Sequence, residues 1–133
     1  MTIKSKYLSN ISIPISLGEL IDKITILEIK IIHMNGKKLI NVKKELRLLQ
    51  DKLENTSLEI DINLINSLKK VNNSLWNIED SIRIKESNQE FDNDFIQLAR
   101  SVYKENDRRS SIKKEINQKY NSEIIEEKSY KDY

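Results

Sequence analysis

Charged side chains at apolar positions of one predicted helix are the residues of this chain best placed to do chemistry. Between Phe95 and Tyr120 the apolar residues recur at helical spacing, and Arg109 and Lys113 fall inside the same stripe. Asn106 shares that stripe. A helix that turns this stripe toward its neighbours buries two cations, which costs several kcal/mol per ion unless each cation meets an anion. The sequence therefore predicts acidic partners or an anionic ligand for these two side chains.

Acidic partners are available on two other predicted helices. Glu28 lies on the apolar sector of the first helix, and Glu79 lies beside the apolar stripe of the third. We expect these two acids, or Glu86 one helical repeat further on, to face the two cations. Glu28 and Glu79 are also the candidate acid or base groups if the domain is an enzyme, which the sequence leaves open.

Polar residues on the third and fourth helices form the predicted ligand-binding site. Arginine has a planar donor fork that suits phosphate and carboxylate groups, and four cations outnumber the acids in this set. We therefore expect an anionic small molecule, such as a nucleotide, a sugar phosphate or a carboxylate, in a polar cleft between these helices. Trp76 either forms the floor of this cleft or belongs to the core. The predicted ligand-binding residues are Asn72, Trp76, Glu79, Arg83, Arg100, Tyr103, Asn106, Arg109 and Lys113.

Two other functions fit the same residues. A buried ion-pair network can be purely architectural, and the domain would then be a non-catalytic protein-interaction or oligomerisation module. Alternatively, Glu19 and Asp22, with Glu79 and Asp80, resemble the magnesium-binding carboxylates of all-α nucleotide pyrophosphohydrolases, although the Glu-Glu-x-x-Glu tract of those enzymes is missing. The main interpretation requires no metal and no cofactor.

The composition limits the fold and the partners. Charged residues make up 33% of the 133 residues, hydrophobic residues 38%, and there are only two glycines and one proline, which is typical of a single polar helical domain. The absence of cysteine excludes disulfides and thiolate metal sites. The net charge of +2 is small and the lysine pairs fit solvated helix faces, so neither nucleic acid nor a membrane is an expected partner. The amino-terminal residues lack the features of a signal peptide, so we expect a cytoplasmic protein.

The spacing of apolar residues predicts four helices joined by short loops. A capping box at Ser16 to Glu19 starts the first helix near residue 17, and Asn35-Gly36 ends it. The other helices are predicted at about 38–54, 61–86 and 93–119. The predicted fold is therefore an all-α antiparallel helical bundle of about four helices with a short extended N-terminal segment. The predicted organisation is a flexible arm at 1–10, a bundle at 11–120 and a charged C-terminal tail at 121–133.

The first helix is apolar on more than one side. Ile26 and Ile29 lie away from its main apolar stripe. This helix is therefore either central in the bundle or the contact surface of a homodimer, and the sequence leaves both interpretations open.

Four sequence blocks resemble an uncharacterised family of bacterial and phage domains of unknown function. The blocks are PISLGELIDKITILEIK at 14–30, LWNIED at 75–80, LARSVYKENDRR at 98–109 and EKSY at 127–130. The resemblance extends over the chain from residue 11 onward. It implies no established activity, and no catalytic role carries over to any residue. In some members the domain is joined to glycosyltransferase or tetratricopeptide regions, so the resemblance points toward surface-polysaccharide biology.

Overall fold

Four α-helices make up the fold in the computed structural model, which describes residues 9–133. They are α1 (Leu17–His33), α2 (Gly36–Asn55), α3 (Ile62–Ser87) and α4 (Asn93–Lys119). The all-α prediction is confirmed, and the observed bounds agree closely with the predicted ones. Residues 9–16 precede α1 without regular secondary structure, and the rest of the predicted N-terminal arm lies outside the described residues. None of the four helices is both long enough and apolar enough to cross a bilayer.

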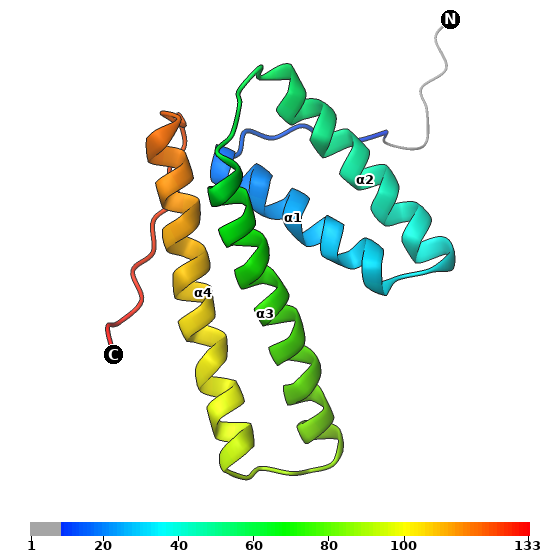
Figure 1. Cartoon of the computed structure of the whole chain (residues 1–133), viewed down its shortest axis with the longest axis vertical. Coiled ribbons are helices and arrows are strands. Elements are labelled where there is room, and N and C mark those ends of the chain that lie inside the picture. The colour runs from blue at the N-terminus through cyan, green and yellow to red at the C-terminus, as the bar shows by residue number, and fades with distance from the viewer. Residues whose placement is uncertain (1–8) are drawn as a thin grey trace, which may run out of the picture.

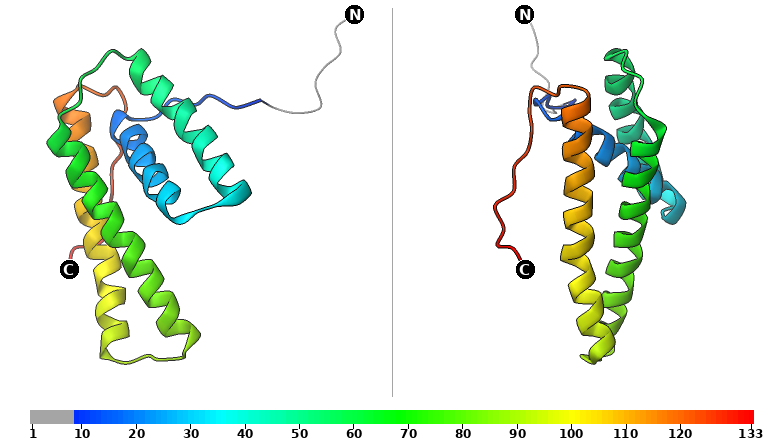
Figure 2. Two further views of the ribbon diagram at one scale, coloured as in Figure 1. Left: turned by 45° about the vertical axis from the view of Figure 1, so that its right-hand side comes forward. Right: turned by 60° about the vertical axis from the view of Figure 1, so that its left-hand side comes forward.

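The helices are arranged as two antiparallel hairpins of unequal length (Figure 1). The α1–α2 hairpin lies against one end of the longer α3–α4 hairpin, whose other end extends past it (Figure 2). α1 contacts each of the other three helices, whereas α2 packs lengthwise on α1 only. The bundle therefore differs from a closed up-and-down arrangement, in which α2 would contact a second helix as well.

Two clusters of buried apolar side chains form the core. The first joins α1 to α2 and contains Leu20, Ile24, Leu27 and Leu46. The second lies where α1 meets α3 and α4 and contains Ile21, Leu64, Leu68 and Ile116. Ile29, on the second apolar side of α1, is only 1% exposed. The central position of α1 therefore accounts for its two apolar sides, while the homodimer stays a prediction.

The first turn of α1 is capped by residues from the far end of the chain. Ser16 Oγ accepts a hydrogen bond from the Glu19 amide at 3.1 Å, as the capping box predicts. The Gly18 amide donates to Asn117 Oδ1 at 2.6 Å, and the Leu17 amide donates to Ser122 Oγ at 3.1 Å. The amides that a helix start leaves unpaired are thus satisfied by α4 and the residues after it.

Gly18 allows the close approach of α1 to α4, and its replacement is our first prediction. A Cβ at this position would lie 2.5 Å from the carbonyl oxygen of Lys113, so the two backbones would have to move apart. We expect Gly18→Ala to lower the free energy of unfolding by about 1–3 kcal/mol, as overpacking does elsewhere. Urea denaturation measures this change.

Gly36→Ala is the control for this prediction. Gly36 has a φ of +61° and nothing within 4 Å of its would-be Cβ, so alanine there adds backbone strain without a clash. That strain is expected to cost about 1 kcal/mol. A Gly18→Ala variant as stable as the unaltered protein would contradict the close packing of α1 on α4.

Candidate binding site

A buried ion pair between Asp22 of α1 and Arg109 of α4 lies at the centre of the polar interior. The Asp22 side chain is 0% exposed and that of Arg109 is 28% exposed. Arg109 Nε donates to Asp22 Oδ1 at 2.9 Å, and its Nη2 donates to Oδ2. This bidentate hydrogen bonding raises the pKa of Arg109 above its usual value. The cation predicted to lie in the apolar stripe is therefore paired within the fold.

Neutral side chains complete the hydrogen bonding of the buried carboxylate. Asn72 Nδ2 donates to Asp22 Oδ1 and to Thr25 Oγ1, each at 2.9 Å. The Thr25 hydroxyl in turn donates to the Asp22 carbonyl at 2.8 Å. Asn72 and Thr25 are themselves buried. The network therefore joins α1, α3 and α4 around one charge, as buried carboxylates require.

A second ion pair lies near the start of α1. Lys113 Nζ hydrogen-bonds to Glu19 and lies 3.7 Å from Glu126 Oε1, which also accepts the Ser16 hydroxyl at 2.8 Å. Burial by itself raises the pKa of Glu19, but the hydrogen bond and charge of Lys113 outweigh burial, so the pKa lies below its ordinary value of 4.5. Lys113 thereby links α4 to α1 and to the chain after α4.

The acids that we expected to face the two cations lie elsewhere. Glu28 pairs with Lys69 at 2.8 Å, and both side chains are about one-third exposed. Glu79 pairs with Arg83 on its own helix at 3.3 Å, and Glu86 is exposed. The expected pairing was wrong because α1 crosses only part of α3, so that the polar stripe of α3 faces solvent beyond Trp76.

The burial of Asp22 has a signal in the sequence, although the spacing of large apolar residues does not reveal it. Gly18, Asp22, Thr25 and Ile29 are spaced by 4, 3 and 4 residues, which puts them on one face of α1. All four are buried. Only one of the four is a large apolar residue, because the stripe also contains a glycine and a threonine.

An open groove lies between α3 and α4, with α1 along one side. Six of the nine predicted ligand-binding residues line this groove. Its volume is about 440 Å³. The predicted residues that line it are Asn72, Trp76, Glu79, Arg83, Asn106 and Arg109. Ile26, Leu75 and Asp80 complete the lining. Glu28, the other candidate catalytic acid, is not part of it.

The charges of this groove nearly cancel. Arg83 is paired with Glu79, and Arg109 is paired with Asp22 behind the groove wall. Asp80 adds a further negative charge to the lining. The excess of cations that the sequence suggested is therefore not found in the groove, and a ligand with many negative charges would be repelled.

Two residues that line the groove have a hydrogen-bond donor without an acceptor in the described chain. Trp76 is half-buried, and its indole Nε1 is a buried donor with no partner among residues 9–133. The Trp76 ring stacks on His33 with centroids 4.6 Å apart and an interplanar angle of 18°. Arg109 uses Nε and Nη2 for Asp22, and within the described chain its Nη1 forms no hydrogen bond. A buried donor without an acceptor costs about 1–3 kcal/mol, so an oxygen that reached the indole N–H of Trp76 would be favoured.

The other three predicted ligand-binding residues lie away from the groove. Arg100 is exposed and donates to Gln97 Oε1 at 3.2 Å. Tyr103 packs edge-on against Tyr133, with ring centroids 5.1 Å apart. Lys113 belongs to the second ion pair. These three residues share α4 with Arg109, but none of their side chains lines the groove.

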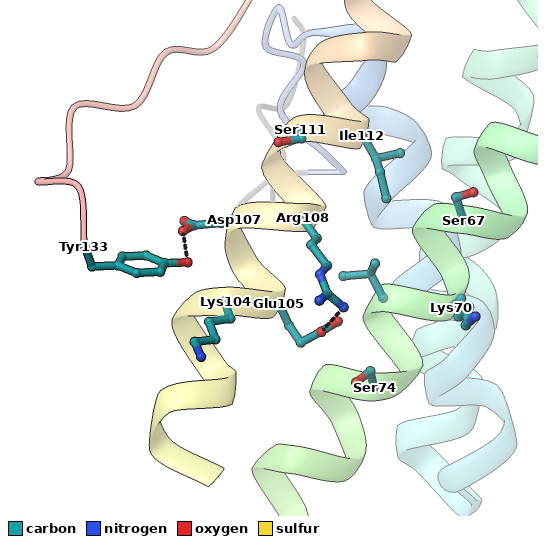
Figure 3. Close-up of a pocket in the computed structure, with 11 residues that line it drawn as sticks. Ser67, Lys70, Ser74, Lys104, Glu105, Asp107, Arg108, Ser111, Ile112 and Tyr133 are labelled. Atoms are coloured by element: carbon teal, nitrogen blue, oxygen red, sulfur yellow. Dashed lines mark hydrogen bonds and ion pairs between the residues drawn. The ribbon is translucent and has the colours of Figure 1, made fainter. Parts of the chain in front are cut away.

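A larger groove of about 730 Å³ lies on the opposite face of the α3–α4 hairpin, and none of the predicted residues lines it. Figure 3 shows that Arg108 reaches across it beside Glu105, with which it pairs at 2.8 Å. Tyr133, from the chain after α4, donates its hydroxyl to Asp107 at 2.8 Å on the other side of α4. These four polar residues are thus paired with one another, whereas Lys70 and Lys104, which also line this groove, form no ion pair within residues 9–133.

Three of the four carboxylates proposed for magnesium are engaged with cations, and Asp80 is the exception among the described residues. Glu19 and Asp22 form the ion pairs described above, and Glu79 pairs with Arg83. Across residues 9–133, no three acidic or histidine side chains come close enough together to hold one metal ion.

Comparison with known proteins gives one match. The sequence profile of a family of unknown function, DUF6165, matches residues 11–133. No curated protein and no solved structure matches the chain significantly. The match covers nearly all of the described chain, including every residue of the two ion pairs and of the groove.

The Asp22–Arg109 pair gives our second prediction. We expect Arg109→Met to lower the free energy of unfolding by about 3–5 kcal/mol, because it leaves a buried carboxylate without its cation. Adding Asp22→Asn removes that charge and should recover much of the loss, giving a coupling energy in a double-mutant cycle. Arg108→Met is the control, since Arg108 is exposed, and should change stability by only about 0.5 kcal/mol. Equal effects at 108 and 109 would contradict the structural role of the pair.

The Glu19–Lys113 pair gives a third prediction, on pH. The lowered pKa of Glu19 in the folded state means that its stabilising contribution is present above the ordinary value of 4.5 and is lost as pH falls through the lowered value. In Lys113→Met we expect the pKa of Glu19 to rise, because burial and the charge of Asp22 are then opposed only by the more exposed Lys23. Carboxyl NMR titration measures this pKa. Lys114→Met is the control, since Lys114 pairs with Glu127 at the surface, and a Glu19 titration unchanged in Lys113→Met would refute the assignment.

Proposed function

The chain belongs to the DUF6165 family of unknown function, and from that premise we propose that it binds a small polar molecule with a single anionic group in the α3–α4 groove. The observation that carries this proposal is the buried, unpartnered indole N–H of Trp76 in the same groove as Arg109. A sugar monophosphate or a carboxylate offers the oxygens that both donors lack.

The charge of the groove narrows the ligand class. Arg109 keeps three of its five N–H donors after pairing with Asp22, but its net charge is balanced by that carboxylate. Asp80 and Glu79 oppose additional negative charge at the rim. We therefore propose a ligand with one phosphate or carboxylate and several hydroxyls over a nucleoside triphosphate.

The amides of the groove suit hydroxyl groups. Asn106 lines the groove opposite the α3 residues and offers both a donor and an acceptor. The aliphatic side chains of Ile26 and Leu75 provide apolar surface beside these polar groups. Pockets for small molecules commonly combine a few directed polar groups with an apolar lining.

A protein-interaction or oligomerisation module is the second candidate. The observation that favours it is the complete burial of Asp22 with Arg109, because a network paired within the fold needs no ligand. The magnesium-dependent enzyme has no comparable support, since three of its four proposed carboxylates, Glu19, Asp22 and Glu79, are paired with cations.

Tryptophan fluorescence gives a direct test and our fourth prediction, because Trp76 is the only tryptophan in the chain. We expect a hexose monophosphate or a small hydroxycarboxylate to change the emission of Trp76 and to raise the melting temperature, as ligands that bind the folded state do. A nucleoside triphosphate should have a smaller effect. Inorganic phosphate alone tests whether the anionic group suffices.

Variants at the edge of the groove locate the ligand. We expect Asn106→Ala and Arg83→Met each to weaken binding about tenfold, the loss typical of one directed hydrogen bond to an anion. Arg100→Met is the matched control, because this exposed arginine of α4 lies outside the groove. If none of these compounds changes the emission or the melting temperature, the binding function is refuted and the architectural candidate is favoured.

A further inference from the structure

The end of the α1–α2 hairpin holds a concentration of positive charge. Residues 29–47, which we call the basic hairpin end, contain six of the 23 basic residues and one of the 21 acidic residues. The remainder of the chain therefore has 17 basic residues against 20 acidic ones, so the positive surplus of the protein lies in this segment. The six basic residues are Lys30, Lys37, Lys38, Lys43, Lys44 and Arg47.

These six cations are not neutralised by the fold. Within residues 9–133 none of them forms an ion pair, whereas nine other lysines and arginines do. Five of the six are exposed, and Lys30 is half-buried. The cause is the position of α2, which packs only on α1, with this end at the margin of the molecule (Figure 1). The nearest acid before the segment, Glu28, is already paired with Lys69.

Two large aliphatic side chains are exposed among these cations. Ile32 is 73% exposed and Ile40 is 67% exposed. Ile32 follows Ile31, which packs on the core cluster between α1 and α2, and Ile40 follows the half-buried Leu39 of α2. A step of about 100° beyond the seam in two antiparallel helices leads to the same side of the hairpin. The basic hairpin end therefore presents both isoleucines on one side with lysines around them.

We propose that the basic hairpin end binds the surface of an anionic lipid bilayer. Lysines attract acidic headgroups, and their long aliphatic stems let the charges stay at headgroup level while the isoleucines enter the acyl boundary. The lysine pairs alone fit solvated helix faces, and the exposed isoleucines are what the structure adds. This surface is separate from the α3–α4 groove and does not depend on a ligand there.

The same surface is poorly suited to nucleic acid. Single strands are bound by aromatic rings that stack on bases, and the only ring in this segment, His33, is already stacked on Trp76. Isoleucine side chains gain nothing from contact with phosphates. Five of the six cations are lysines, which act as point charges and lack the planar fork of arginine.

Vesicle co-sedimentation tests this proposal and is our fifth prediction. We expect the full chain to bind phosphatidylcholine vesicles that contain phosphatidylserine, to bind pure phosphatidylcholine vesicles far less, and to dissociate as salt is added. Lys37→Gln and Lys38→Gln should each weaken binding about fivefold. Ile32→Ser with Ile40→Ser should weaken it about tenfold, through loss of apolar burial.

Exposed residues elsewhere provide matched controls. Ile62 and Ile84 of α3 are each 61% exposed and lie outside the basic hairpin end, so Ile62→Ser with Ile84→Ser should leave binding unchanged. Circular dichroism and thermal melts establish that each variant is folded. Because all substituted side chains are exposed, we expect their stabilities to be close to that of the unaltered protein.

Three results would overturn the proposal. The first is equal sedimentation with anionic and neutral vesicles, or none with either. The second is binding to anionic vesicles that is unaffected by loss of both isoleucines, since that would be non-specific charge attraction. The third is tighter binding to a single-stranded oligonucleotide that depends on the same lysines, which would assign the surface to nucleic acid.

Discussion

The burial of one carboxylate charge constrains the rest of the structure. Asp22 is completely buried, and in the interior its charge is tolerated only with a cation and hydrogen-bond donors in place. Arg109 and Asn72 must therefore lie within hydrogen-bond distance of one point on α1, which fixes the height and rotation of α1 against α3 and α4. Apolar side chains alone would stabilise many neighbouring registers. Gly18, one turn earlier, permits the backbone approach that this register requires.

Because of this constraint, the contacts on the two sides of α1 differ in kind. Toward α2 the contact is an apolar seam, which stabilises without strong direction. Toward α3 and α4 the contact includes directed polar groups, which select one arrangement. The chain after α4 adds to the second contact, since Ser122 accepts from the Leu17 amide and Glu126 accepts from the Ser16 hydroxyl. Part of the predicted tail at 121–133 is therefore integral to the start of α1. The apolar tail residues Ile124, Ile125 and Tyr130 stay exposed.

The sequence indicates which face of each helix is apolar. That was sufficient to predict the four helices and the two cations, Arg109 and Lys113, that lie within an apolar stripe. It did not predict the partners, because helical spacing describes one helix at a time and says nothing of how far two helices overlap. Glu79 lies on the same stripe of α3 as the buried Asn72. However, α1 crosses α3 before residue 79, so Glu79 is exposed. The peripheral position of α2 was hidden for the same reason. Its single apolar stripe is compatible with one neighbour or with two.

The pairing of Arg109 also determines what kind of site the groove can be. Asp22 balances the charge of the guanidinium, so an anion there would be held by directed N–H donors and less by net charge. The same pairing holds the guanidinium rigid, which lowers the entropy that a ligand must overcome on binding. In the proposed binding function, such a groove would discriminate between ligands by geometry more than by net charge. The architectural and binding interpretations of Arg109 are then compatible, because the edge that stabilises the fold and the edge that faces the groove are different parts of one side chain.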